Sequence, residues 1–161
     1  MKFMIKPLVS TLVFWIISLG ISYSAPIAKR YIDNKNGTIT DIRTGLTWQK
    51  NDSYHDFKKA MSWYAALDYA DLKNSEKFAG YNDWRLPTLE ELRTIWDPSR
   101  PILSKDEEKI GLPKVFTARG SYYLWANDER GLDMAWYLGL GQREKYFNLK
   151  EANDLGQGVK L

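Results

Sequence analysis

Residues 30–50, RYIDNKNGTITDIRTGLTWQK, alternate short β-branched runs with two turn signals. Asn36-Gly37 supplies the positive φ angles that a tight hairpin needs, and Thr44-Gly45 repeats the device eight residues later. The pattern predicts a three-stranded antiparallel meander. A calcium loop of the EF-hand type is the alternative for these Asp and Asn residues, but lysine and glycine stand where that loop needs oxygen ligands.

Two helices are expected after this meander. Residues 56–72, DFKKAMSWYAALDYADL, space apolar side chains three and four apart, which predicts an amphipathic helix with Asp56 as its N-cap. A second helix is predicted to begin at Thr88, because Thr88 and Glu91 have the spacing of a capping box. Its apolar stripe continues until Pro98 stops it.

The second half of the chain predicts a loop and then strands. Residues 97–120 combine prolines, glycines and a charged run with weak periodicity, so we expect a long surface loop. Residues 122–125, 134–138 and 145–147 are rich in aromatic side chains and are separated by polar or glycine-containing turns, which predicts an antiparallel sheet. The order is therefore strands, two helices, a long loop, and strands again.

The N-terminus has the pattern of an export signal. Two lysines precede an apolar run at residues 8–21, and the small residues Ser22 and Ser24 follow it. We interpret residues 1–24 as a Sec-type signal peptide, which leaves a single domain at residues 25–161. A retained anchor is the alternative, but a bilayer span needs about 20 apolar residues and this run is shorter, so no stable membrane span is expected after cleavage.

The composition excludes several classes of protein. The 161 residues include no cysteine, which excludes thiol nucleophiles, cysteine-ligated zinc and disulfide scaffolds. The formal charge is +3, and the predicted signal peptide contributes two lysines and no acid to it, so the remaining domain has a charge of +1. A nearly neutral exported domain is a poor candidate for nucleic-acid binding, which needs a concentrated positive face.

The order of these pieces resembles the Lcl C-terminal domain family, the bacterial domain named for the end of collagen-like adhesins, and the endostatin-like surface proteins of spirochaetes. The resemblance covers residues 30–161, and residues 41–48 and 81–88 are its most diagnostic parts. It implies an α+β, C-type-lectin-like fold with two helices packed on antiparallel β-sheet, used for binding and not for catalysis. The residues that we assign to its structural signature are Trp48, Asp83, Trp84, Arg85, Pro87 and Trp136.

Two positions depart from the family pattern. Members of the family commonly have one cysteine late in the first helix and another in the last strand, where this chain has Ala70 and Leu161. Both residues are apolar, which predicts a packed contact in place of a disulfide.

Asp83-Trp84-Arg85 has two interpretations. An indole beside a guanidinium and a carboxylate could hold a sugar, because aromatic faces take CH groups and charged groups take hydroxyls or sulfates. Alternatively, Trp84 fills the core, Arg85 ties the segment to the following helix, and Asp83 caps the turn after Gly80. We favour the structural interpretation.

Further candidates lie in the predicted strands. Residues 125–128 resemble the Trp-Asn-Asp calcium element of C-type lectins, but the strand order is reversed and the sugar tripeptide is missing, so no metal or cofactor is predicted. The polar loop at 127–130 and a basic group at Arg143, Lys145, Arg119 and Lys114 are candidates for ligand contact. The candidate ligand-binding residues are Trp125, Asn127, Asp128, Glu129, Arg130, Arg143, Lys145 and Arg119.

The predicted function is that of an exported, non-enzymatic binding module, adhesin-like, in the periplasm, on the cell surface or secreted. Its expected partner is an extracellular glycan, sulfated ones included, or a host matrix or complement protein. An accessory envelope protein that binds other bacterial proteins is the alternative, and a glycan hydrolase is a remote one, since no carboxylate pair is singled out. His55, the sole histidine, is expected on the surface, and the oligomeric state stays open.

Overall fold

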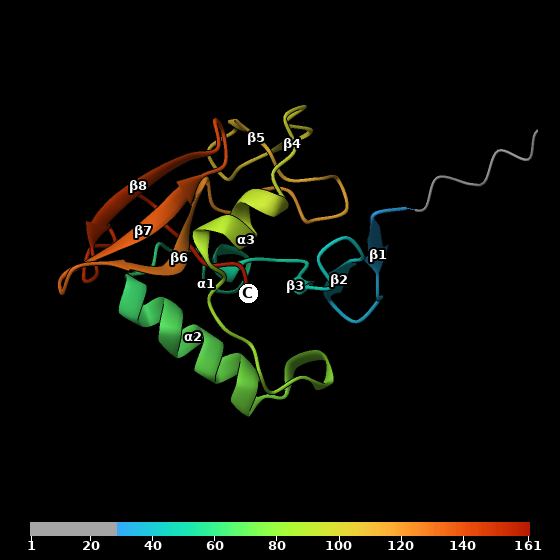
Figure 1. The fold of residues 1–161 in the computed structure, drawn as a ribbon, viewed down its shortest axis with the longest axis horizontal. Helices are drawn as coiled ribbons and strands as arrows, with labels where there is room; N and C mark the ends of the chain where they lie inside the picture. Colours follow the sequence, from blue (N-terminus) through green and yellow to red (C-terminus); the bar gives the residue numbers. More distant parts are fainter. Residues whose placement is uncertain (1–28) are drawn as a thin grey trace, which may run out of the picture.

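The computed structural model describes residues 29–161, so the predicted signal peptide lies outside the described residues. Within this range the fold is α+β, with three antiparallel sheets and three α-helices (Figure 1). No helix between residues 29 and 161 is long and apolar enough to cross a membrane.

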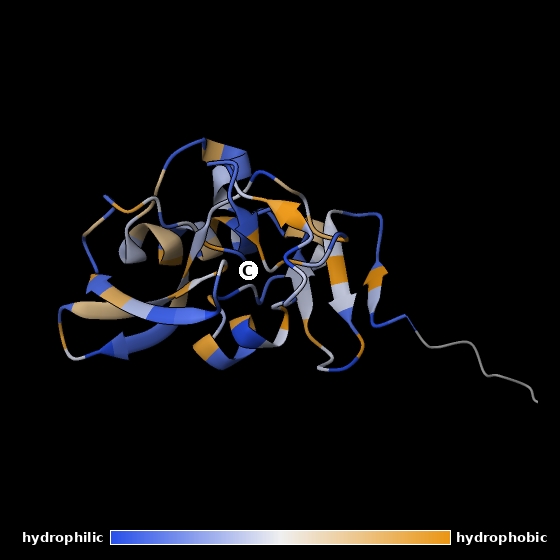
Figure 2. Cartoon of the chain, turned by 90° about the horizontal axis from the view of Figure 1, so that it is seen from above, coloured by the Kyte–Doolittle hydropathy of each residue, from blue (hydrophilic) through white to orange (hydrophobic). Residues whose placement is uncertain are grey.

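The predicted N-terminal meander is confirmed. Strands β1 (Tyr31–Asp33), β2 (Thr38–Asp41) and β3 (Thr47–Gln49) pair antiparallel in this order. The two turns contain glycines with φ of +88° at Gly37 and +74° at Gly45, conformations that residues with a side chain rarely adopt. Figure 2 shows the three strands side by side at one end of the molecule.

The single helix predicted at residues 56–72 was wrong, because the chain forms two helices there. They are α1 (Ser53–Phe57) and α2 (Trp63–Ser75). The N-cap of α1 is Asp52 and not Asp56, and Lys58 ends this helix in the left-handed conformation with φ of 55°. Helix α2 then begins anew after Ser62, whose hydroxyl accepts a hydrogen bond from the backbone of the first turn.

The predicted C-terminal sheet is confirmed. Strands β6 (Tyr123–Arg130), β7 (Met134–Gly139) and β8 (Glu144–Leu149) form an antiparallel sheet in chain order. The predicted capping box is also confirmed, since Thr88 and Glu91 start helix α3 (Leu89–Thr94).

Both faces of this sheet are covered by helices. On one face, Leu89 and Leu92 of α3 belong to a buried cluster with Leu124 and Leu138 of the sheet. On the other face, α2 shares a second cluster with Trp125 and other sheet residues. Because β6 and β7 are buried on both faces, successive residues are hydrophobic in these strands and do not alternate with polar ones.

The surface loop predicted at residues 97–120 was wrong in part. Strands β4 (Ile102–Leu103) and β5 (Lys109–Ile110) form a small hairpin, and Ile110, Leu112 and Phe116 are buried in the cluster beneath α3. Because each strand has two residues, the segment contains too few positions for a periodic pattern.

The last residues of the chain complete the core. The backbone oxygen of Leu161 accepts a hydrogen bond from Gln49 N at 2.6 Å, and that of Val159 accepts one from Ser53 N at 2.9 Å. Ala70 and Leu161 are both buried in the cluster that includes α2, so these two apolar residues pack in one cluster, as expected from the sequence.

Candidate functional site

Four side chains form a patch on the outer part of the β6–β7–β8 sheet, which we call the cationic–aromatic patch: Arg130, Trp136, Lys145 and Phe147. Trp136 and Phe147 are register partners on β7 and β8, with ring centroids 5.5 Å apart in an edge-to-face arrangement. The Arg130 guanidinium lies 3.5 Å from the Phe147 centroid, and Lys145 Nζ lies 4.6 Å from the Trp136 centroid. Each cation is thus held against an aromatic face.

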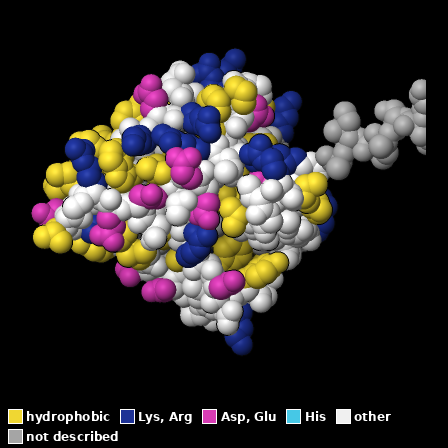
Figure 3. All heavy atoms as spheres, in the orientation of Figure 1, with side chains coloured by type: hydrophobic (Ala, Val, Ile, Leu, Met, Phe, Trp, Pro, Cys, Tyr) yellow, Lys and Arg dark blue, Asp and Glu magenta, His cyan; other side chains and the backbone are white. Residues whose placement is uncertain are grey.

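The positive charge of this patch is not neutralised locally. Arg130 and Lys145 are exposed, and neither forms an ion pair with another residue of the 29–161 range. Figure 3 shows dark-blue cationic and yellow hydrophobic side chains side by side over this part of the molecule.

The acidic neighbours of the patch are engaged elsewhere. Asp128 accepts a hydrogen bond from Leu89 N at 2.7 Å, and Glu129 forms an ion pair with Lys150. Glu144 accepts a hydrogen bond from the Tyr146 hydroxyl at 2.6 Å, which raises the pKa of Tyr146 to about 12. These contacts leave the two patch cations available to a ligand.

A bulge in β6 sets the direction of Arg130. The register shifts between Trp125 and Glu129, and the extra residues dock on the start of α3, where Asn127 N donates to Pro87 O at 2.8 Å. After the bulge Arg130 pairs with Met134, two residues from Trp136, which places it on the same face as that indole.

Three other predicted contact residues, Trp125, Arg119 and Arg143, are not part of the patch. Trp125 is 0% exposed and its Nε1 donates to Met61 O at 2.8 Å, so its indole belongs to the core and not to a binding surface. Arg119 forms an ion pair with Glu107 in the β4–β5 turn. Arg143 is exposed in the turn between β7 and β8.

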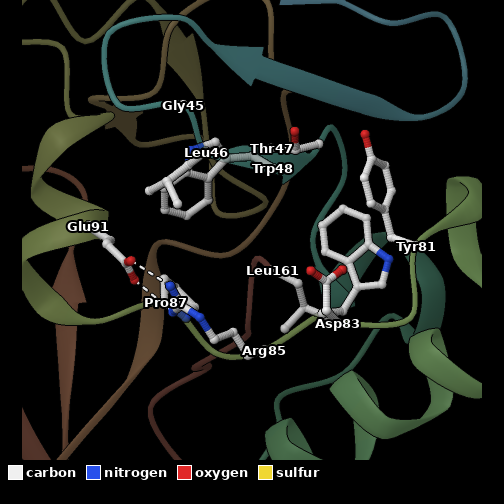
Figure 4. A pocket seen from close by; sticks show the side chains of 11 residues that line it. Gly45, Leu46, Thr47, Trp48, Tyr81, Asp83, Arg85, Pro87, Glu91 and Leu161 are labelled. Atoms are coloured by element: carbon white, nitrogen blue, oxygen red, sulfur yellow. Dashed lines mark hydrogen bonds and ion pairs between the residues drawn. The ribbon is translucent and has the colours of Figure 1, made fainter.

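Five of the six residues of the structural signature line a cavity, and the sixth, Trp136, belongs to the cationic–aromatic patch. The cavity has a volume of about 320 Å³ and lies between the β2–β3 turn, the segment before α3 and the C-terminal residue (Figure 4). Its lining residues are Gly45, Leu46, Thr47, Trp48, Tyr81, Asp83, Trp84, Arg85, Pro87, Glu91 and Leu161.

Hydrogen bonds fix the wall formed by Trp84 and Arg85. The Asn74 side chain accepts from Trp84 N at 2.6 Å and donates to Trp84 O at 2.8 Å, and the indole is 7% exposed. Arg85 binds both carboxylate oxygens of Glu91, at 2.6 and 2.8 Å, and this contact lowers the pKa of Glu91. The predicted packing of Trp84 and the predicted tie from Arg85 to α3 are confirmed.

His55 is mostly buried, so its predicted surface position was wrong. Its Nδ1 lies 2.7 Å from Asp52 Oδ1 and its Nε2 lies 3.0 Å from Ala118 O, with 13% of the side chain exposed. The hydrogen bond to Asp52 raises the pKa of His55. No group of three or more His, Cys, Asp or Glu side chains suited to a metal ion occurs in the described part of the chain.

Phe147 and Asn74 were not among the predicted candidates, and neither were several residues that line the cavity, such as Tyr81. Phe147 could have been found by pairing the predicted strands at 134–138 and 145–147, which puts it opposite Trp136. Asn74 gives no such signal, because its partner in space is ten residues away and lies outside any regular element.

One of three comparisons with known proteins found a match. A family model described as the Lcl C-terminal domain matches residues 37–159. No curated protein and no solved structure shows significant similarity to the chain. The matched range runs from the turn before β2 to the residues that close the core, and includes both the patch and most of the cavity lining. The chain therefore belongs to the Lcl C-terminal domain family.

Proposed function

We propose that this chain is an exported, non-enzymatic binding module of C-type-lectin-like fold that binds a sulfated extracellular glycan on the cationic–aromatic patch. The observation that carries the proposal is the pair of exposed, unpaired cations held against the adjacent rings of Trp136 and Phe147. Guanidinium and ammonium groups bind sulfate oxygens, and aromatic faces take the CH groups of sugar rings.

Two further points support this function. Membership of a family named for the end of collagen-like adhesins favours a protein that acts outside the cell. The apolar run at residues 8–21, preceded by two lysines, is typical of an export signal. A host matrix or complement protein that carries such glycans is a partner of the same chemistry.

The test measures binding of heparin fragments to the purified protein by calorimetry at several salt concentrations. We expect binding that weakens with salt, because the contacts are ionic and exposed. The double variant Arg130→Gln/Lys145→Gln should bind at least about tenfold more weakly, from the loss of two charge-assisted hydrogen bonds worth about 1.5–3 kcal/mol each before screening.

The matched control is the double variant Lys59→Gln/Lys109→Gln, which removes two exposed cations outside the patch and gives the same net charge. Phe147→Ala adds a variant that keeps every charge and should also weaken binding. Equal losses in the patch and control variants would show that only net charge matters. Absence of heparin binding, with capture of bacterial envelope proteins alone, would instead support an accessory envelope role.

A further inference from the structure

The cavity in Figure 4 lies apart from the patch and has the properties of a ligand site of its own. We propose that it binds a single uncharged sugar ring. This inference does not rest on the function proposed for the patch, because it uses different residues and a different ligand chemistry.

The size and walls of the cavity fit one ring. Its volume of about 320 Å³ is at the lower end of the range of about 300–1,000 Å³ that is typical of small-molecule sites. Tyr81 and Trp84 meet edge to face, with centroids 5.6 Å apart, and form one aromatic wall, while Trp48 contributes a second indole. Such walls offer apolar contact to the CH groups of a pyranose.

The polar groups at the cavity call for a ligand that both donates and accepts hydrogen bonds. The Asp83 carboxylate forms no hydrogen bond or ion pair within the described chain, and Figure 4 shows its side chain among the residues that line the cavity. Arg85, which is exposed and also lines the cavity, supplies hydrogen-bond donors near this acceptor.

Arg85 contributes further donors. A guanidinium has five N–H groups, and Arg85 donates three hydrogen bonds, two to Glu91 and one to Leu86 O. The remaining N–H groups are available to a ligand oxygen. Sugar hydroxyls donate and accept at once, so one ring can bind Asp83 and Arg85 together.

The charge balance disfavours two other ligand classes, sulfated glycans and alkylammonium ions. Arg85 is paired with Glu91, so the unpaired charge at the cavity is the negative Asp83 carboxylate, which repels a sulfated glycan. An alkylammonium ion would be attracted by Asp83 and by the rings, but it has no acceptor for the Arg85 donors. An uncharged polyol is the class that these groups recognise.

The experiment is saturation-transfer NMR of the purified protein with the methyl glycosides of glucose, galactose, mannose and N-acetylglucosamine. We expect at least one glycoside to bind saturably in the millimolar range, as befits a single small ring. Asp83→Asn should weaken this binding by about tenfold or more, because it removes a charged acceptor. Asp71→Asn, which removes an exposed carboxylate on α2, is the matched control and should leave binding unchanged.

Asp83 has no hydrogen-bond or ion-pair partner among residues 29–161, so Asp83→Asn should unfold at the same denaturant midpoint as the parent protein. Heparin binding on the patch should also persist in this variant. Conversely, Arg130→Gln/Lys145→Gln should keep the glycoside signal. The proposal is overturned if none of the glycosides shows saturable binding, even at concentrations well above the millimolar range. It is also overturned if Asp83→Asn binds the glycoside as strongly as the parent protein does. Asp83-dependent binding of tetramethylammonium without glycoside binding would also overturn it, since the site would then take cations.

Discussion

The Asn74 side chain provides the sharpest test of the structure, because it alone holds the backbone of Trp84. It accepts from Trp84 N at 2.6 Å and donates to Trp84 O at 2.8 Å. We consider the substitution Asn74→Ala, which removes both hydrogen bonds and leaves two backbone groups of a residue that is 7% exposed without partners.

The size of the effect follows from these two groups. A buried polar group that loses its partner costs about 1–3 kcal/mol, so two such groups cost about 2–4 kcal/mol allowing for some contact with water. Position 74 lies near the end of α2, where alanine is a better helix former than asparagine. This difference in helix propensity offsets about 0.5 kcal/mol of the lost stability. We therefore expect the free energy of unfolding to fall by about 1.5–3.5 kcal/mol.

The assay is denaturant unfolding followed by tryptophan fluorescence, with the midpoint and the m-value fitted together. Ser75→Ala is the control, because Ser75 is the exposed neighbour and its hydroxyl bonds only to Leu72 O within the same helix. It should change stability by less than about 0.5 kcal/mol. An equally small change for Asn74→Ala, with an unchanged m-value, would refute the role assigned to Asn74.

Three further predictions concern single side chains. Gly120→Ala should destabilise the protein by about 2 kcal/mol in thermal unfolding, because the new Cβ would lie 2.4 Å from the buried Asp52 Oδ2; a stabilised variant would contradict this packing. Tyr31→Phe should raise the free energy of unfolding by up to about 1 kcal/mol, since the buried Tyr31 hydroxyl has no partner in the described chain; a loss of stability would show that it has one. Asp52 raises the pKa of His55, so the stability that His55 adds is complete below its unfolded pKa of about 6.5 and is lost as the pH rises through the higher folded pKa. The stability difference between the parent protein and His55→Gln should thus shrink with rising pH, and denaturant titrations in which it grows would contradict the sign.

Local patterns in the sequence predicted the regular parts of the fold. Asn36-Gly37 and Thr44-Gly45 need only neighbouring residues to form their turns, and the capping box from Thr88 to Glu91 is complete within four residues. These patterns predict structure correctly because the interactions that stabilise each turn or cap are made by residues close together in the chain.

The predictions were wrong in segments whose structure depends on contacts between residues far apart in the chain. The apolar residues of α1 and α2 fit the pattern of one continuous helix. However, Asp52 accepts a hydrogen bond from Ser121 N and His55 forms one with Ala118 O, and these contacts fix α1 as a separate helix. In the candidate sites, the polar run after Trp125 predicted an exposed loop. A bulge that docks on α3 instead turns Asp128 toward Leu89 N and leaves Arg130 facing outward.

The contacts of residues 157–161 have a consequence for the timing of folding. Lys160 is 1% exposed, and its ammonium group donates to the carbonyls of Gln49, Lys50 and Asn51, which precede it by about 110 positions. Contacts between residues so far apart form late and slowly, because a long loop must close before they contribute. A ribosome that has added only the first 150 residues has therefore not yet made the lysine that binds these carbonyls, and the growing polypeptide stays open until synthesis has passed it.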